Sequence, residues 1–477
     1  MVFSSNVFLL FFLPLFMIGY YACPKRFRNY VILLFSIVFY AYGAPDFILW
    51  LLATTIANFY LVKAMRKTDN TKRKKLFCGL AIGISLSLLV YFKYANFLID
   101  NVLSLFNLFN PNRSPLTSPL SILLPIGISF FTFQSITYVI DTYRGNNEPM
   151  EKLTDYIVYI MMFPQLIAGP IVRYCDIEGE IRQRHYSATE IMQGFYRFII
   201  GLSKKVLIAD VLGAQVDQLL ATDLTLMDTG TAWITIAAYT MQLYFDFSGY
   251  SDMAIGLGKM MGFHFPENFD NPYNSRSITE FWRRWHITLG SFMRNYLYIP
   301  LGGNRCPKRR MYFNLWVVFL LSGLWHGASW NFVIWGAYHG LFICLEKIRG
   351  ERIERRGKLS TLISHLFTLI IVMVGWALFR IENLGDAFTF ISRLFAFSFK
   401  GFGTINDMQF YAMLLLALAF SFLTLFPWGK KLQDAVFYKE YPFAGHLIAW
   451  PIAIFLLLFC LTAFNIVGFS PFIYFRF

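Results

Sequence analysis

Long apolar runs, separated by short basic or Gly/Pro-containing segments, make up most of this 477-residue chain. An α-helix needs about 20 apolar residues to cross a bilayer, and several of the runs are shorter than this. The shorter ones favour tilted, re-entrant or protein-buried helices. The pattern predicts helices at 7–22, 30–42, 47–62, 76–92, 121–140, 156–172, 191–209, 232–258, 311–325, 330–345, 359–379, 408–428 and 447–468. We therefore expect an all-α polytopic membrane protein with about 11–13 membrane helices.

The run at 156–172 departs from a simple span. Residues 162–170 contain Pro164 and Pro170. Because proline in a helix interior removes a backbone hydrogen bond, a regular helix is disfavoured here. The segment predicts a re-entrant turn that lines a cavity.

Basic clusters predict the orientation of the spans. Residues 25–28 and 63–75 are rich in Lys and Arg and flank the segment 30–62, which has a turn signal at 43–46. Both flanks of such a hairpin fall on one side, which the positive-inside rule makes cytoplasmic. The N-terminus is then predicted to be extracytoplasmic.

The stretch 311–345 contains no Asp, Glu, Lys or Arg, yet holds His326 near its middle. Basic clusters at 308–310 and 347–358 flank it, so we expect a hairpin with its break at 327–331. His326 would then lie beyond the membrane midplane, toward the outer face. An ionisable side chain at this depth is costly unless it lines a cavity and does chemistry. The alternative is a neutral histidine hydrogen-bonded to a neighbouring helix.

Composition and charge narrow the class of protein. The chain is 57% hydrophobic and 15% charged, against about 25% charged residues in soluble proteins. Its net charge of +14 lies in clusters between apolar runs, which disfavours nucleic-acid binding. The six cysteines show no metal-ligand spacing, so we expect free thiols and no metal site. We interpret 7–23 as a first span with no signal-cleavage site.

One integral-membrane domain over 1–477 is the expected organisation. Within it we distinguish N-terminal helices (1–120), a catalytic core (121–346) and C-terminal helices (347–477). No internal repeat of the kind found in inverted-repeat transporters is visible in the sequence.

A second candidate site lies in the aromatic and arginine-rich segment 274–294. If 279–296 forms one helix, Trp282, Trp285, Leu289 and Phe292 share a face. One interpretation is an interfacial amphipathic helix on anionic lipid. The other is a cytoplasmic funnel that holds a phosphate-bearing donor, with His286 at its throat. The guanidinium groups for such a funnel would come from Arg276, Arg283, Arg284 and Arg294.

Coenzyme A thioesters fit the second interpretation, since their phosphates lie far from a reactive carbonyl on a long thin arm. A neutral imidazole could take the proton from a hydroxyl as it attacks that carbonyl.

Other polar residues have weaker signals. His339 lies thirteen residues beyond His326 and is first expected to pack, although it could approach the site. Asp141 and Asp246 each follow an uncharged run and could orient a histidine, cap a helix or mark the membrane boundary. No GxSxG, P-loop or HExxH sequence supports serine-hydrolase, NTPase or zinc-protease chemistry.

Six blocks in a fixed order resemble the membrane-bound O-acyltransferase family, and most closely its bacterial alginate O-acetyltransferase branch. The resemblance covers nearly the whole chain. The blocks are FDFSGYSD (245–252), FPENFDNPY (265–273), FWRRWH (281–286), YIPLGG (298–303), LWHGA (324–328) and WGAYHG (335–340).

This resemblance implies a multi-helix membrane domain around a central tunnel. It implies that His326 is the principal catalytic residue and that His286 is a second polar residue of the active site. Trp325, Asp141, Asp246 and His339 are supporting candidates for this site. It further implies cytoplasmic acetyl-CoA as donor, with no permanently bound cofactor. The acetyl group would pass to an extracytoplasmic partner protein or a cell-surface glycan such as alginate. The expected location is the bacterial inner membrane, in contact with lipid.

Two alternatives stay open at this point. A D-alanyl transferase for teichoic acids would share these motifs but use a carrier-protein donor. A transporter for an acyl donor or a glycan lipid would more often show repeats. A pure scaffold for a secreted acetyltransferase complex fits the motifs less well than either.

Overall fold

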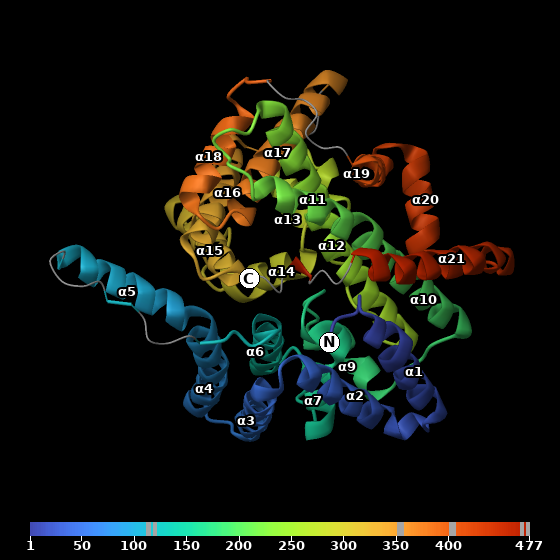
Figure 1. The fold of residues 1–477 in the computed structure, drawn as a ribbon. Helices are drawn as coiled ribbons and strands as arrows, with labels where there is room; N and C mark the ends of the chain where they lie inside the picture. The colour runs from blue at the N-terminus through green and yellow to red at the C-terminus, as the bar shows by residue number, and fades with distance from the viewer. Residues whose placement is uncertain (111–115, 118–121, 351–356, 400–406, 468–471, 474–477) are drawn as a thin grey trace. The chain divides into compact units, whose positions relative to one another are not determined.

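The computed structural model describes residues 1–110, 116–117, 122–350, 357–399, 407–467 and 472–473. Helices make up the secondary structure of these residues, and no strand occurs among them. The prediction of an all-α protein is confirmed. The chain divides into two compact units, which are described separately (Figure 1). The single-domain organisation stays a prediction.

The first unit contains residues 10–184, together with Met1 and 327–329. After η1 (Phe8–Phe12), its helices are α1 (Leu13–Ala22), η2 (Lys25–Phe27), α2 (Arg28–Gly43), η3 (Pro45–Phe47), α3 (Ile48–Lys67), α4 (Thr71–Leu89), η4 (Val90–Tyr94), α5 (Ala95–Phe109), α6 (Ile128–Arg144), α7 (Leu153–Met161), α8 (Phe163–Leu166) and α9 (Tyr174–Arg182).

The second unit contains residues 2–9, 185–326 and 330–477. Its helices are α10 (Ala188–Ser203), η5 (Lys204–Ala209), α11 (Asp210–Leu220), α12 (Thr229–Met261), η6 (Pro272–Asn274), α13 (Ile278–Arg284), α14 (Ile287–Phe292), η7 (Met293–Tyr298), α15 (Lys308–His326), α16 (Trp330–Arg349), α17 (Lys358–Arg380), α18 (Leu384–Leu394), α19 (Met408–Phe422), η8 (Leu423–Leu425), α20 (Pro427–Phe437) and α21 (Phe443–Val467).

Five helical stretches among the described residues are long and apolar enough to cross a membrane: Pro45–Lys67, Thr71–Phe109, Lys358–Arg380, Met408–Leu425 and Phe443–Phe464. The last of these, in α21, exposes Leu447, Ile448, Phe455 and Phe459. Exposed apolar faces of this size are expected where lipid replaces water. The protein is therefore a multi-pass membrane protein, while the count of 11–13 membrane helices and the central tunnel stay predictions.

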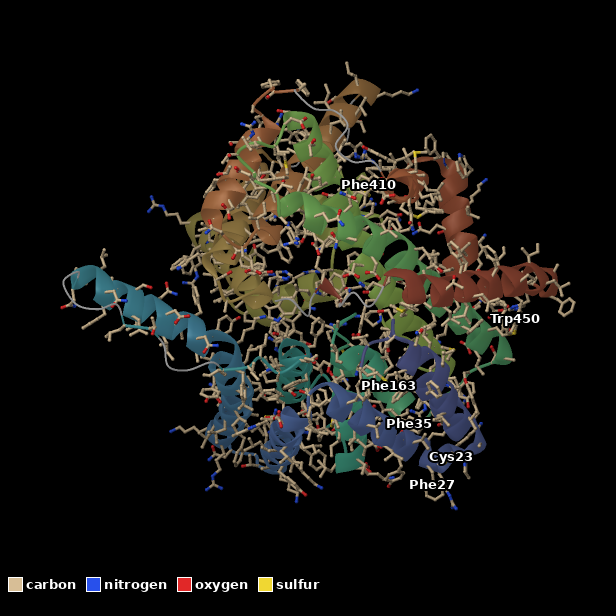
Figure 2. The ribbon with its side chains drawn as sticks, viewed as in Figure 1. Cys23, Phe27, Phe35, Phe163, Phe410 and Trp450 are labelled. Atoms are coloured by element: carbon tan, nitrogen blue, oxygen red, sulfur yellow. The ribbon has the colours of Figure 1, made fainter. Side chains whose placement is uncertain are left out.

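The first unit has an aromatic core around Phe163. Its ring lies 5.0 Å from that of Phe16 and 5.3 Å from that of Phe12, centre to centre, and Phe35 packs against both of these (Figure 2). Phe163 begins α8, a single turn after the break between α7 and α8 at Met162. As the two prolines predict, no regular helix runs through 162–170, and this whole stretch is buried. Whether it lines a cavity stays a prediction.

The second unit is built on the close crossing of α10 and α12, which lie side by side (Figure 1). Two glycine pairs, Gly194 with Gly256 and Gly201 with Gly249, bring the two backbones into contact. A Cβ atom at Gly194 would lie 2.7 Å from the Gly256 carbonyl oxygen. Small residues at a helix crossing allow this approach in membranes, where apolar burial drives helix association little.

Helices α15 and α16 form the hairpin predicted for 311–345, with the connection at 327–329. The two helices approach each other closely at Gly323 and Gly336. A Cβ atom at Gly336 would lie 3.4 Å from the Gly323 Cα atom. This hairpin fixes His326 as the last residue of α15.

Candidate functional site

His326 lies in an aromatic enclosure in the second unit. The residue is only 4% exposed. The ring centres of Trp325, Trp335 and Phe379 lie 4.9, 5.0 and 5.2 Å from the centre of the imidazole. All three rings present an edge-on geometry to the imidazole, which fixes its position by packing. The enclosing residues come from α15, α16 and α17, so three helices define the site.

His286 lies at a break between α13 and α14, with φ 45° and ψ 55°. A non-glycine residue in this left-handed region stores strain that the surrounding structure must offset. The expectation of one continuous helix over 279–296 is therefore wrong: Trp285 ends α13 in an extended conformation, and a π-helix follows α14. As a consequence the four aromatic and apolar residues predicted to share one helix face do not lie on a single helix.

Trp325 contacts both histidines. The centre of its indole ring lies 5.9 Å from the centre of the His286 imidazole and 4.9 Å from the centre of the His326 imidazole. Both histidines are buried. The structure thus brings together the three residues that the FWRRWH and LWHGA blocks suggest, although 40 positions separate the histidines in sequence.

Asn268 holds His286 through a side-chain hydrogen bond. The distance between Asn268 Oδ1 and His286 Nδ1 is 3.0 Å. The same oxygen accepts from the Thr288 hydroxyl at 2.9 Å, and the Asn268 carbonyl accepts from the Ile287 amide at 3.0 Å. Asn268 lies in the FPENFDNPY block, but the sequence gives no sign that it contacts a histidine 18 residues later.

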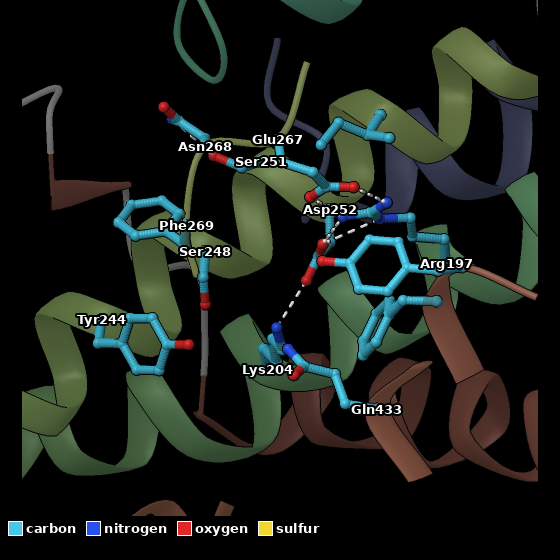
Figure 3. Close-up of a pocket in the computed structure, with 13 residues that line it drawn as sticks. Arg197, Lys204, Tyr244, Ser248, Ser251, Asp252, Glu267, Asn268, Phe269 and Gln433 are labelled. Atoms are coloured by element: carbon cyan, nitrogen blue, oxygen red, sulfur yellow. Dashed lines mark hydrogen bonds and ion pairs between the residues drawn. The ribbon is translucent and has the colours of Figure 1, made fainter. Parts of the chain in front are cut away.

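Asn268 also lines a polar pocket beside α12 (Figure 3). Arg197 on α10 reaches across to Asp252 on α12 at 2.8 Å and to Glu267 at 2.6 Å. Lys204 donates to the other oxygen of Asp252 at 2.6 Å. The positive charges of two cations and the negative charges of two carboxylates therefore balance in the lining of this pocket. The pocket is lined by Arg197, Lys204, Tyr244, Ser248, Ser251, Asp252, Ile255, Glu267, Asn268, Phe269, Gln433, Phe437 and Tyr438.

Asp246 and Asp141, the two aspartates considered as supporting candidates, have other partners. Asp246 is in the interior of α12, 2.8 Å from Lys205 Nζ, and it accepts from the Ile473 amide. Because it lies in the helix interior, it does not cap a helix. A role for Asp246 in the site stays a prediction. Asp141 lies near the end of α6 in the first unit, where its carboxylate accepts from Asn146 at 3.4 Å. A role for Asp141 in the site stays a prediction.

The four arginines of the predicted donor funnel occupy different surroundings. Arg276, Arg283 and Arg294 are exposed. Arg284 pairs with Glu280 one turn earlier on α13, at 2.8 Å. The role of these arginines in donor binding stays a prediction.

His339 lies fully buried on α16 among indole rings. Its ring centre is 5.1 Å from those of Trp282 and Trp335. Within the described part of the chain neither ring nitrogen has a hydrogen-bond partner. These surroundings fit the packing role first expected of it, and its support of the site stays a prediction.

Sequence comparison identifies the chain's relatives. Residues 147–385 match the MBOAT, membrane-bound O-acyltransferase family. The chain is 43% identical over 432 residues to the probable alginate O-acetylase AlgI of Azotobacter vinelandii, covering 90% of this chain and 85% of that protein. It is 35% identical over 422 residues to the peptidoglycan O-acetyltransferase of Helicobacter pylori, covering 81% and 78%.

A more distant similarity covers about half of the chain. The teichoic acid D-alanyltransferase of Bacillus subtilis is 27% identical over 245 residues, which cover 49% of this chain and 62% of that protein. The matched residues include His286, Trp325 and His326. The chain belongs to the membrane-bound O-acyltransferase family and is a membrane O-acyltransferase.

Proposed function

We propose that this protein transfers an acetyl group from cytoplasmic acetyl-CoA to a hydroxyl on the extracytoplasmic side of a bacterial inner membrane. The acceptor is a cell-surface polysaccharide such as alginate, or a partner protein that passes the acetyl group on. One observation carries the proposal: two buried histidines both contact Trp325 in a chain 43% identical over 432 residues to a probable alginate O-acetylase.

His326 acts as the general base in this proposal. Its imidazole takes the proton from the acceptor hydroxyl as the oxygen attacks the thioester carbonyl carbon. When the carbon–sulfur bond breaks, the imidazolium returns the proton to the departing thiolate. Ester and free thiol are the products, and the histidine is regenerated. His286, which also contacts Trp325, assists this transfer.

The aromatic enclosure suits this role. The three rings around the imidazole hold it in one position for the proton transfer. Exclusion of water also protects the thioester from hydrolysis. General-base help of this kind contributes about 10²–10⁴-fold to a rate.

The test uses purified full-length protein, acetyl-CoA labelled in the acetyl group, and alginate with or without a soluble partner. We expect labelled acceptor with wild type and a loss of about 10²-fold or more with His326→Ala. The matched control is His185→Gln, since His185 is exposed. A folded His326→Ala variant with wild-type turnover would refute the catalytic assignment.

Two further arms separate the alternatives. A D-alanyl transferase would leave acetyl-CoA intact and accept D-alanine from a carrier protein. A transporter would move donor or lipid across a vesicle wall without cleaving the thioester. The D-alanyltransferase relative covers half of the chain, whereas the O-acetylase relative covers 90%, and this favours acetyl transfer.

A further inference from the structure

Three hydrogen bonds, with Thr288 and Ser251, fix the orientation of the Asn268 side chain. A backbone amide can only donate, and the Thr288 amide points at Oδ1 at 3.4 Å. The Thr288 hydroxyl donates to the same oxygen at 2.9 Å. On the opposite side, the Asn268 amide nitrogen donates to the Ser251 hydroxyl on α12 at 3.1 Å. The atom facing His286 is therefore the carbonyl oxygen.

An oxygen acceptor dictates where the neighbouring imidazole carries its proton. Because Asn268 Oδ1 can only accept, His286 Nδ1 must donate across the 3.0 Å between them. A neutral imidazole has one N–H, so the lone pair then belongs to Nε2. Without such a partner nothing in this contact would select one tautomer over the other.

Burial strengthens this selection. Asn268 and His286 are each only 1% exposed, and Ser251 is 2% exposed. If the Asn268 amide N–H faced the N–H of His286, two donors would meet without an acceptor. At a buried site water cannot replace the lost hydrogen bond, so this arrangement would be costly. The backbone reinforces the contact, since the Ile287 amide donates to the Asn268 carbonyl at 3.0 Å and holds the left-handed turn at His286.

We propose that Asn268 is a positioning residue, which fixes His286 in the Nδ1–H tautomer and presents its basic Nε2 atom to the reaction. Ser251 and Thr288 hold the amide of Asn268 in the required orientation. The kinetic consequence rests on the proposed function, in which His286 assists transfer. The tautomer itself does not depend on any activity.

The first test is therefore spectroscopic and needs no substrate. Full-length protein labelled with ¹⁵N-histidine in lipid nanodiscs is examined by NMR, and the His286 signals are identified by their loss in His286→Gln. We expect a protonated Nδ1 and an unprotonated Nε2 in wild type. A wild-type His286 with its proton on Nε2 would overturn the proposal, whatever any variant does.

Two substitutions at Asn268 extend this test. Asn268→Leu removes the acceptor, and we expect part of the His286 population to move its proton to Nε2. Asn268→Asp keeps an acceptor oxygen, and we expect the proton to stay at Nδ1. An unchanged tautomer in a folded Asn268→Leu variant would contradict the proposal.

Asn274 supplies a matched control. It is buried in the same segment, but its side chain donates to the Thr424 hydroxyl at 2.7 Å and not to a histidine. Asn274→Leu should therefore leave the His286 signals unchanged. If it changed them as Asn268→Leu does, the effect would be a general loss of local structure and the proposal would fail.

A double-mutant cycle links the tautomer to the rate. Asn268→Leu is expected to lower acetyl transfer by about 10²-fold, the lower end of general acid–base help. In a His286→Gln background the same substitution should have no further effect, because the residue acts through His286. If the two substitutions instead lowered the rate independently, so that their fold-losses multiplied in the double variant, Asn268 would not act through His286. Full activity of His286→Gln would instead refute the assisting role of His286, and the tautomer result would stand apart from it.

Discussion

Gly201 on α10 and Gly249 on α12 face each other so closely that a Cβ atom on either would nearly touch the carbonyl oxygen of the other. The distances would be 2.5 Å from Gly201 and 2.7 Å from Gly249. We predict that Gly201→Ala destabilises the protein by about 1–3 kcal/mol, because the backbones must separate to admit the methyl group. Thermal unfolding in detergent measures this.

Gly83 on α4 is the control for this prediction. A Cβ atom there would have nothing within 4 Å. Gly83→Ala should be neutral or slightly stabilising, since alanine favours a helix more than glycine does. Equal losses in the two variants would mean that the α10–α12 crossing is not sensitive to side-chain size.

Asp252 is the shared partner of two cations, and its loss should be costly. Asp252→Asn would leave Lys204 without its carboxylate and Arg197 with Glu267 alone. Removing one partner of a buried pair destabilises by about 3–5 kcal/mol, because a charge is left uncompensated. We expect a lowered unfolding temperature for this variant.

The matched control is the exposed ion pair of Arg66 and Glu148, at 2.6 Å, with the Glu148 side chain 68% exposed. Glu148→Gln should cost no more than about 1 kcal/mol. If both substitutions had the same small effect, water would reach the Asp252 cluster freely, and the cluster could not be regarded as buried.

Asp228 begins α12 as its N-cap. Its carboxylate accepts from the Gly230 amide at 2.9 Å and from the Thr231 amide at 3.2 Å. Partial burial acts to raise the pKa of this carboxyl, but the hydrogen bonds from Thr231 and Gly230 outweigh it and hold the pKa below its ordinary value. The charged form is therefore favoured by the fold.

The sign of the pH dependence follows. A carboxyl whose pKa is lower in the folded state contributes stability above its unfolded pKa, near 4, and loses it as the pH falls through the folded value. We predict that Asp228→Ala costs about 1 kcal/mol at neutral pH and that this cost shrinks in acid. Asp228→Asn keeps the cap but cannot titrate. It should cost little and remove this part of the acid sensitivity, and equal pH profiles for Asn and wild type would contradict the assignment.

Apolar periodicity predicted the elements that face lipid or the interior, but not the amphipathic ones. The hairpin of α15 and α16 and the break near Pro164 follow from the sequence, because missing charges and prolines act locally. Helices α5, α9, α11, α18 and α20 were not predicted. Apart from α5, which is mostly apolar, their mixed composition resembles that of loops, and tertiary contacts decide their structure.

Polar contacts between residues far apart in the chain could not be predicted from the sequence either. His326 and His286 can be selected because they are ionisable residues in unusual surroundings. Nothing local indicates that Asn268 reaches His286, or that Arg197 reaches Asp252 across 55 positions. The break at His286 needs a left-handed backbone at a histidine, which residue preferences disfavour and only the surrounding hydrogen bonds support.

Trp325 packs against both histidines, so its size should matter for both stability and rate. Trp325→Ala is predicted to cost about 3–5 kcal/mol through the cavity it leaves. We also expect acetyl transfer per folded molecule to fall more than about tenfold, since loss of the indole frees both imidazoles to shift by the roughly 1 Å that impairs catalysis. Trp325→Phe keeps an aromatic ring at this position and should retain most of the rate.

Trp376 is the control that distinguishes a specific effect of Trp325 on the histidines from a general loss of packing. It is as buried as Trp325 and packs on Trp335 and Trp285, and no ring contact joins it to His326 or His286 among the described residues. Trp376→Ala should therefore lose a similar amount of stability but less of the rate per folded molecule. Thermal unfolding gives the first quantity and labelled acetyl transfer, measured well below the unfolding temperature, gives the second. If the two alanine variants lost rate in proportion to stability alone, Trp325 would be a packing residue with no separate effect on the histidines.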